Sequence, residues 1–329
     1  MSICIGHIRL DNPVLLAPMS GVTDMPFRRL ARRLGAGLVV SEMVVSHELL
    51  SGSREGLRRI EHDGDAEAPV VVQLAGNDAD MMAEGARMAV DHGAAVIDIN
   101  MGCPAKKVCG GLAGSALMAN MRKAFQIIEK TVKASGVPVT LKMRSGWDDQ
   151  NRNAPELARG AEALGVRMVT VHGRTRCQFY RDRADWRFIG EVKQAVGIPV
   201  VANGDVTDFA AAAEIRRQSG ADGLMIGRAC YGRPWLPGQI AAFLATGERR
   251  ADPDLTTRLG LVLEHFDGML DHHGPELGVR CFRKHFGWYS GALADGEMWR
   301  TTVNRLVCPD AVRRTIVGAF DAAGERQAA

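Results

Sequence analysis

Eight short apolar runs recur between residues 14 and 226, and a polar side chain follows or interrupts each of them. The runs cover residues 14–17, 37–40, 70–72, 95–97, 139–141, 168–171, 200–202 and 224–226. Runs of this length suit strands that are buried on both faces, as in a parallel sheet. Polar groups at the carboxyl ends of parallel strands are typical of the active site of a (β/α)8 barrel. The pattern therefore predicts an α/β enzyme built on a TIM barrel.

Amphipathic stretches lie between the apolar runs and predict the helices of such a barrel. The clearest cover residues 25–34, 80–92, 121–134, 154–164, 186–195 and 209–218. An open doubly wound sheet is the alternative, but no GxGxxG sequence follows a predicted strand, as its dinucleotide site would require. After Arg228 the periodicity is helical alone. We therefore expect a TIM barrel over residues 1–248 and a small all-helical bundle domain over residues 249–329.

The composition excludes several classes of protein. A net charge of +3 is too small to indicate a nucleic-acid partner by itself. The seven cysteines are odd in number and have no CxxC spacing, which argues against a disulfide framework or a zinc ribbon. No apolar run approaches the roughly 20 residues that cross a bilayer. We expect a cytoplasmic monomer with no membrane segment and no metal site.

Cys103 lies directly after the fourth predicted strand, and a loop containing glycines and lysines follows it. With an ordinary pKa of about 8.5, a thiol is mostly protonated at neutral pH, so it can donate a proton as well as act as a nucleophile. The alternative is a small buried apolar residue, which is the usual position of a free cysteine. Position alone leaves both interpretations open.

Two further candidates end the fifth and sixth strands. Lys142 interrupts an apolar run, and a lysine is rarely buried without a partner, so a bound anion or electron-rich ring is expected beside it. His172 ends the sixth strand and Arg174 follows two residues later, which suggests a pair of polar groups at the barrel mouth. The alternatives are a lysine that reaches water and a histidine with a purely structural role.

The loops after the last two strands read Asn203-Gly204-Asp205 and Gly227-Arg228. Many TIM barrels bind phosphate at these two loops. The glycines permit close approach of the backbone and the arginine supplies charge, although each glycine could also serve only to turn the chain. With no dinucleotide fingerprint elsewhere, the two loops together favour flavin mononucleotide (FMN), with its phosphate here and its ring across the mouth.

A basic and aromatic segment lies at residues 280–289, in the predicted bundle. Its basic side chains are Arg280, Arg283, Lys284 and His285. Such a mixture can hold phosphates and stack on bases. It is equally typical of an amphipathic helix with a solvated basic face, which is the interpretation that these residues alone favour.

Taken together, seven segments resemble the tRNA-dihydrouridine synthases, most of all their bacterial B-type branch, which is also described as nitrogen-regulation-like. They are residues 17–24, 73–76, 98–108, 142–147, 171–176, 203–205 and 225–228. The resemblance spans nearly the whole chain, and its most specific parts are the Cys103 segment and the paired phosphate loops. There are two departures: Ser20 stands where alanine is common, and the loop at 177–185 matches only loosely.

The resemblance implies an FMN-dependent barrel in which NADPH or NADH reduces the flavin. The flavin then reduces the C5–C6 double bond of a uridine in tRNA. Cys103 would be the general acid that protonates C5, and Lys142 would stabilise negative charge on the reduced flavin. The family's contacts with FMN would fall on Pro18, Met19, Ser20, Gln73, Lys142, His172, Asn203, Gly204, Asp205, Gly227 and Arg228.

The resemblance also implies contacts with the tRNA substrate. Asn100 would orient the uracil and Arg174 would bind a phosphate. The target base must leave its stack to reach the barrel mouth, at a cost of a few kcal/mol. The helical domain would offset that cost by binding the RNA backbone through Arg280, Arg283, Lys284 and His285.

Two other functions are compatible with parts of the sequence. A flavin barrel that acts on a small molecule, such as dihydroorotate or a dihydropyrimidine, would explain the barrel and FMN but not the added helical domain. A non-catalytic RNA-binding or regulatory protein would need no flavin, and pure protein without colour would favour it.

Overall fold

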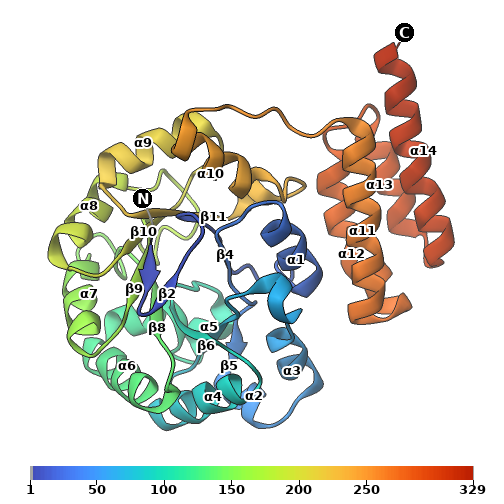
Figure 1. Cartoon of the computed structure of the whole chain (residues 1–329). Coiled ribbons are helices and arrows are strands. Elements are labelled where there is room, and N and C mark those ends of the chain that lie inside the picture. The colour runs from blue at the N-terminus through green and yellow to red at the C-terminus, as the bar shows by residue number, and fades with distance from the viewer. Residues whose placement is uncertain (1–2, 329) are drawn as a thin grey trace.

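The computed structural model describes residues 3–328, and it contains a ring of parallel strands surrounded by helices, with a helical bundle beside it (Figure 1). The predicted TIM-barrel fold and the predicted C-terminal helices are both confirmed. Nine strands pair in the order β4-β3-β11-β10-β9-β8-β7-β6-β5. Their bounds are β3 (Val14–Leu16), β4 (Leu38–Val39), β5 (Val44–Val45), β6 (Val71–Ala75), β7 (Val96–Met101), β8 (Val139–Arg144), β9 (Met168–His172), β10 (Val200–Asn203) and β11 (Gly223–Ile226).

The ninth strand arises because the second barrel strand is split into two pieces. β4 pairs with β3, whereas β5 pairs with β6. Between them, the N–H of Ser41 donates to the Val71 carbonyl over 3.0 Å and the Ser41 hydroxyl accepts from the N–H of Gln73 over 2.9 Å. The segment therefore changes its partner from one side of the ring to the other, and the eight predicted strands form a closed barrel.

The six predicted barrel helices are all present within a residue or two. They are α1 (Met25–Arg33), α4 (Ala79–Asp91), α6 (Met121–Ser135), α7 (Ala154–Ala163), α8 (Trp186–Ala195) and α9 (Phe209–Ser219). Gly136 and Gly220 end two of them in the left-handed conformation that glycine adopts without strain. Further helices were not predicted because they are short or lack a clear period: α2 (Ser46–Leu50), α3 (Arg54–Ile60), α5 (Lys106–Gly110), α10 (Leu236–Thr246) and the 3-10 turns η1 (Gly64–Glu67), η2 (Gly114–Ala119) and η3 (Arg228–Cys230).

A hairpin of β1 (Cys4–Ile5) and β2 (Ile8–Arg9) closes the amino-terminal end of the barrel. Ile3, Ile5 and Leu10 pack in one apolar cluster with barrel side chains such as Leu15 and Val201. This end is therefore filled by apolar side chains. The cavity lies at the other end, where the strands have their carboxyl ends.

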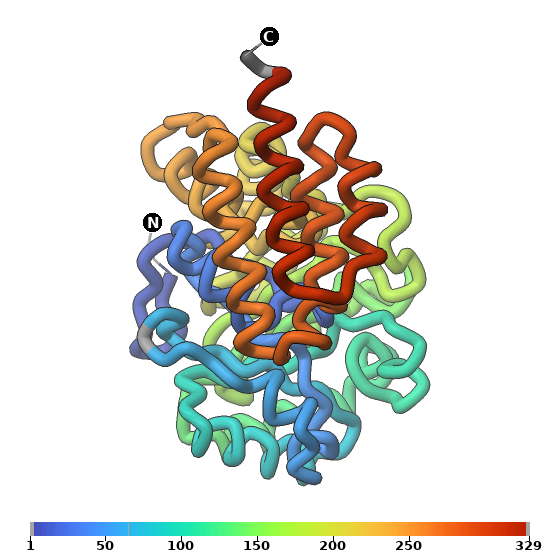
Figure 2. The backbone as a smooth tube through the Cα atoms, turned by 90° about the vertical axis from the view of Figure 1, so that its right-hand side faces the viewer, coloured from blue at the N-terminus to red at the C-terminus, as the bar shows by residue number. Residues whose placement is uncertain are grey.

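The bundle consists of α11 (Leu255–His273), α12 (Pro275–Ser290), α13 (Gly296–Arg305) and α14 (Pro309–Ala328). It has an apolar core of its own, which includes Phe266, Phe282 and Ile316. Figure 2 shows the four helices side by side against one flank of the barrel, where α11 contacts α1 and Arg33 pairs with Glu264. In the described part of the chain, no helix combines the length and apolar composition that a membrane span requires.

Candidate active site

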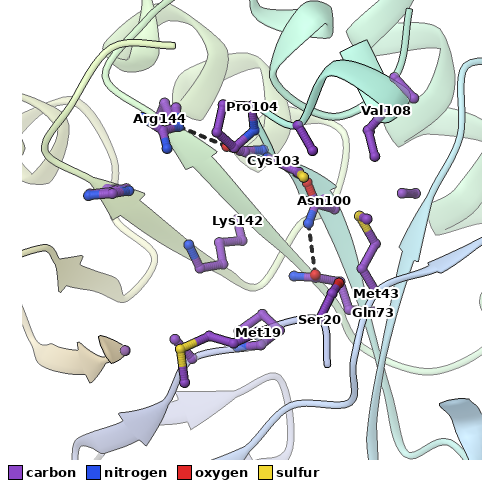
Figure 3. Close-up of a pocket in the computed structure, with 18 of the residues that line it drawn as sticks. Met19, Ser20, Met43, Gln73, Asn100, Cys103, Pro104, Val108, Lys142 and Arg144 are labelled. Atoms are coloured by element: carbon purple, nitrogen blue, oxygen red, sulfur yellow. Dashed lines mark hydrogen bonds between the residues drawn. The ribbon is translucent and has the colours of Figure 1, made fainter. Parts of the chain in front are cut away.

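A cavity of about 1220 Å³ opens at the carboxyl ends of the barrel strands (Figure 3). Every candidate site residue that the sequence places in the barrel lines this cavity. These residues are Pro18, Met19, Ser20, Gln73, Asn100, Cys103, Lys142, His172, Arg174, Asn203, Gly204, Asp205, Gly227 and Arg228. They come from seven different strand ends or the loops behind them, so closure of the barrel is what brings them together.

A buried hydrogen-bond network forms the floor of the cavity below Asn100. The amide nitrogen of Asn100 donates to Oε1 of Gln73 over 2.8 Å, and Nε2 of Gln73 donates to Oδ2 of Asp98 over 2.7 Å. Oδ1 of Asp98 accepts from the Thr140 hydroxyl over 2.6 Å. Burial raises the pKa of the Asp98 carboxyl, while the Thr140 and Gln73 hydrogen bonds oppose that rise. The network fixes the orientation of the Gln73 and Asn100 side-chain amides at the cavity floor.

Hydrogen bonds to the backbone N–H and carbonyl of Cys103 hold this residue at the rim of the cavity. Its N–H donates to Oδ1 of Asn100 over 3.0 Å. Its carbonyl accepts from both the hydroxyl and the N–H of Ser115, over 2.8 and 3.0 Å. Burial raises the pKa of the half-buried Cys103 thiol above its ordinary value. The thiol therefore stays protonated at neutral pH, as a general acid requires.

Lys142 lies inside the barrel, where it supplies a positive charge to the cavity. Burial, with the nearby charge of Arg144, lowers the pKa of Lys142 to about 8. Within the described residues its amino group has one hydrogen-bond acceptor, Oδ1 of Asn203 at 3.2 Å. An ammonium group has three donors, so two remain for a ligand in the cavity.

His172 is held as a neutral ring by Arg174. Nη1 of Arg174 lies 3.2 Å from Nε2 of His172, and because arginine can only donate, Nε2 accepts and Nδ1 carries the proton. Burial and the neighbouring charge of Lys142 lower the pKa of His172 well below its ordinary value. His172 therefore presents a neutral N–H donor at neutral pH.

The same arginine holds several other groups of the site in place. Besides the contact with His172, Arg174 donates to both carboxylate oxygens of Asp205 over 2.8 Å and to the carbonyls of Arg181 and Asp182. Its side chain is 3% exposed, and each of its three nitrogens has at least one partner. Arg174 therefore positions His172 and Asp205, and its predicted contact with a substrate phosphate stays a prediction.

The loops after β10 and β11 form a concave surface with few side-chain atoms. Gly204 has φ +122°, and a Cβ on it would lie 2.7 Å from the Cβ of Ala184 and 3.0 Å from Cδ2 of His172. Arg228 stands over the facing loop with half of its side chain exposed, and its nearest carboxylate, Asp205, is 3.9 Å away. A close-lying backbone and a weakly paired guanidinium are features that bind an anion such as phosphate.

Two charged residues of the site were not predicted, although the sequence carried a signal for them. Arg144 and Asp98 lie two positions from Lys142 and Asn100 on β8 and β7, so the alternation of a strand places each pair on one face. Arg144 is 1% exposed and donates to the carbonyls of Gly102, Thr175 and Phe179, which ties the Cys103 loop to the next one. Tyr180, beneath the guanidinium of Arg228, lies in the loosely matching loop, where no sequence signal marked it.

The basic residues of α12 do not line the cavity. Arg280 and Lys284 are exposed, whereas Arg283 is half-buried and donates to the Leu306 carbonyl over 2.9 Å. His285 is 1% exposed and faces α1. This position corrects the predicted RNA contact of His285, because a ring enclosed between the barrel and the bundle cannot reach a phosphate outside the protein.

Comparison with known proteins supports one family. The model of the family "Dihydrouridine synthase (Dus)" matches residues 15–323. A probable tRNA-dihydrouridine synthase of Rickettsia bellii is 51% identical over 323 residues, which cover 98% of this chain and 99% of that protein. The tRNA-dihydrouridine synthase B of Xanthomonas axonopodis pv. citri is 48% identical over 318 residues, which cover 97% and 96% of the two chains.

Solved structures show the same barrel at low sequence identity. An old yellow enzyme homologue from Zymomonas mobilis gives a TM-score of 0.53 at 16% identity over 78% of this chain and 95% of that chain. A 2-naphthoyl-CoA reductase gives 0.57 at 15% identity over 75% of this chain, which spans about half (52%) of the reductase. These likenesses concern the fold alone.

Proposed function

Because this chain belongs to the dihydrouridine synthase family and is an oxidoreductase, we propose that it reduces uridines in tRNA to 5,6-dihydrouridine. The proposed cofactor is FMN and the proposed electron donor is NADPH or NADH. The observation that carries the proposal is one cavity in which a protonated thiol, a buried ammonium group and an anion-binding surface are combined. The names of the relatives support tRNA as the substrate.

The residues of the cavity fit an FMN molecule. The surface formed by Gly204 and Gly227, with Arg228 above it, suits the phosphate, because a Cβ at Gly204 would have no room. Lys142 and His172 supply donors that the described residues leave free, and these suit the polar edge of the flavin ring. Pro18, Met19, Ser20 and Gln73 line the same cavity and would complete the contacts.

When bound, the flavin supplies the hydride that is added to C6 of the uracil. The protein's part is the proton: the Cys103 thiol donates its hydrogen to C5, so one hydride and one proton convert the C5–C6 double bond to a single bond. The resulting thiolate is re-protonated from water. Asn100, whose amide is oriented by Gln73 and whose Oδ1 holds the Cys103 N–H, places the thiol and would orient the uracil edge.

The experiment that tests this proposal compares substrates. The purified protein, loaded with FMN, is given NADPH and tRNA that lacks dihydrouridine, and dihydrouridine is measured by mass spectrometry of the digested RNA. Free uracil and orotate are assayed in parallel. We expect turnover of tRNA only. Turnover of the free bases at a comparable rate would favour the small-molecule flavin barrel, and colourless protein that binds no FMN would favour a non-catalytic role.

Replacing Gly204 with alanine is expected to disrupt the phosphate surface. The added Cβ meets Ala184 and the φ of +122° is unfavourable for an L residue, so the two effects should lower the free energy of unfolding by about 2–4 kcal/mol. FMN binding should weaken as well. Urea denaturation and FMN titration of the apoprotein measure the two effects.

The matched control is Gly220→Ala. This glycine also has a positive φ, but no atom lies within 4 Å of its missing Cβ. We expect about 1 kcal/mol of destabilisation and unchanged FMN affinity. If both substitutions changed the affinity for FMN equally, the space beside Gly204 would not be needed for FMN binding.

We extend the proposal to the helical domain, residues 249–329, as a tRNA-binding surface. Arg280 and Lys284 are exposed one turn apart on α12. Nζ of Lys284 lies 3.3 Å from the position of a Cβ on Gly21, next to cavity residue Ser20. A phosphate backbone that crosses α12 would therefore lead to the cavity mouth.

The double substitution Arg280→Ala/Lys284→Ala is expected to weaken tRNA binding and to make it less sensitive to salt. Each lost phosphate contact should lower the slope of log affinity against log salt by about one. The control, Lys130→Ala/Lys133→Ala, removes two exposed charges from the carboxyl-terminal half of α6, neither of which lines the cavity. If the α12 pair left the salt slope unchanged, or if both pairs lowered it equally, Arg280 and Lys284 would not form the tRNA-binding surface.

The proposed place of action is the cytoplasm, where tRNA and NAD(P)H are available. All seven cysteines are free thiols, which suits a reducing compartment.

A further inference from the structure

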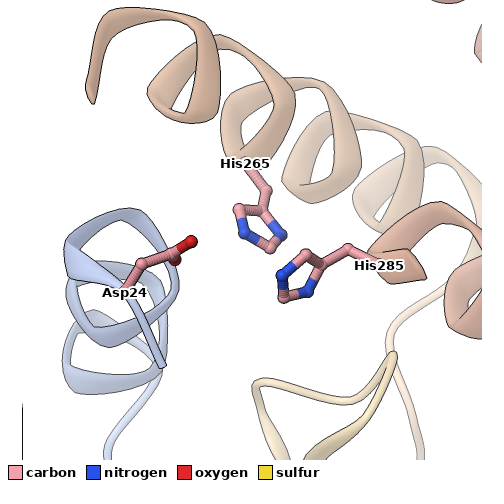
Figure 4. A group of neighbouring side chains, drawn as sticks. All are labelled: Asp24, His265 and His285. Atoms are coloured by element: carbon pink, nitrogen blue, oxygen red, sulfur yellow. The ribbon is translucent and has the colours of Figure 1, made fainter. Parts of the chain in front are cut away.

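Four of the nine histidines lie on α11 and α12, where the bundle meets the barrel, and three of them (His265, His273 and His285) lie near Asp24 at the start of α1. Figure 4 shows Asp24, His265 and His285 directed toward one another from three different helices or their ends. One ligand atom from each lies within 4.8 Å of the others. This group is separate from the cavity, because none of the three residues lines it.

The imidazole nitrogens of this group lack partners. Among the described residues, neither ring nitrogen of His285 has a hydrogen-bond partner, nor does Nε2 of His265. His285 and His265 are each 1% exposed, so bulk water does not reach them. A buried polar atom without a partner costs about 1–3 kcal/mol. Nε2 of His265 and one nitrogen of His285 could share one missing partner.

The carboxylate of Asp24 is also short of a counter-charge. It is 3% exposed, and within the described chain no lysine or arginine pairs with it. Its oxygens accept from the N–H of Phe27 and lie 3.3 Å from Nε2 of His273. Arg28, the nearest arginine in sequence, is occupied by Glu67 and two carbonyls. A cation at this point would neutralise a buried negative charge.

We propose that Asp24, His265 and His285 bind a divalent zinc ion that joins the barrel to the helical bundle. Two imidazole nitrogens and one carboxylate oxygen are a ligand set that zinc accepts in tetrahedral geometry. The ligand atoms of such a site lie about 3.4 Å apart, so small side-chain rotations would draw together the atoms that now lie within 4.8 Å. Nε2 of His273 lies 3.3 Å from Oδ2 of Asp24 but outside this three-residue group, so a larger rotation would be needed for His273 to act as the fourth ligand.

The surroundings of the group support a structural site. Nδ1 of His265 lies 3.0 Å from the Tyr289 hydroxyl, so this second nitrogen is fixed by an outer partner, as metal-bound histidines usually are. Phe27 and Phe282, both 0% exposed, pack against the two rings and exclude water. Buried, apolar surroundings suit a zinc ion that stabilises the fold rather than one that acts on a substrate.

The ion would hold α12 at a fixed place on the barrel. His285 follows Lys284, whose Nζ lies 3.3 Å from the position of a Cβ on Gly21, next to cavity residue Ser20. The sequence alone led us to expect no metal site, and this proposal departs from that expectation. It does not depend on FMN or on tRNA.

The test measures metal directly in the full-length protein. Protein purified without chelator and equilibrated with zinc, then freed of unbound ions, should contain about one zinc per chain by mass spectrometry. His265→Ala and His285→Ala should each lower that content at least tenfold, whereas His7→Ala, which changes an exposed histidine remote from the group, should leave it unchanged. Circular dichroism shows whether each variant is folded.

A second measurement needs no substitution. Cobalt(II) added to the metal-free wild-type protein should give the visible absorption of a tetrahedral site, and zinc should abolish it. Wild-type protein that takes up neither ion would overturn the proposal. Zinc that remains bound in both folded histidine variants would also overturn the proposal, because other residues, such as the free cysteines, would then hold the ion.

Discussion

Replacing Cys103 with alanine is expected to lower the rate of dihydrouridine formation by about 10²- to 10⁴-fold, the usual contribution of a positioned general acid. Flavin content and NADPH oxidation by the free enzyme should remain, because the thiol holds no part of the phosphate surface. The Asn100 and Ser115 hydrogen bonds reach only the backbone of Cys103, so the loop keeps its position in the variant. Single-turnover conversion of uridine in tRNA is the measurement.

Cys109→Ala is the matched control for the Cys103 substitution. The Cys109 sulfur lies 3.4 Å from the Cys103 carbonyl and does not line the cavity. Ser115 still holds that carbonyl after the change, so we expect an effect of only a few fold. If Cys103→Ala retained full activity with tRNA, the general-acid role would be wrong. If both variants lost activity equally, the loop rather than the thiol would be responsible.

The affinity of the apoprotein for FMN is expected to fall by up to tenfold for each pH unit above about 8, through the charge of Lys142. Its amino group has a pKa of about 8, so it is charged below that pH and neutral above it. If FMN needs the charged form, binding above pH 8 must take up a proton, and affinity falls as pH rises. The ionisation of the FMN phosphate is complete near pH 7 and does not contribute. Quenching of FMN fluorescence between pH 7 and 9.5 measures the effect.

Lys142→Met removes the titrating group and should bind FMN weakly, with no dependence on pH in this range. Lys133→Met, an exposed lysine paired with Glu129 on α6, should behave as the wild type. A flat profile for the wild type would show that the charge of Lys142 is not used in binding the cofactor. A slope that survives in Lys142→Met would assign the titration to another group.

The local sequence determined the barrel and most of its cavity. Eight of the nine barrel strands were visible as short apolar runs, whereas β5 was not, and each site residue followed or interrupted its run near the carboxyl end. Parallel strands in a closed ring must bring those ends together, so the position of Gln73, Lys142 or Gly204 in the cavity followed from the topology alone. The resemblance to known synthases then supplied the roles of these residues, which the pattern alone left open.

Only the tertiary structure decided which side chains are free to act. Arg174 and His285 are both basic and near a predicted site, yet one already donates to Asp205 and two carbonyls and the other is enclosed at the bundle interface. The group of Asp24, His265 and His285 joins residues more than 240 positions apart. Periodicity reports which face of its own element a residue occupies. It does not report which side chain of a distant element will pack against that face, and that packing decides which buried nitrogens find a partner.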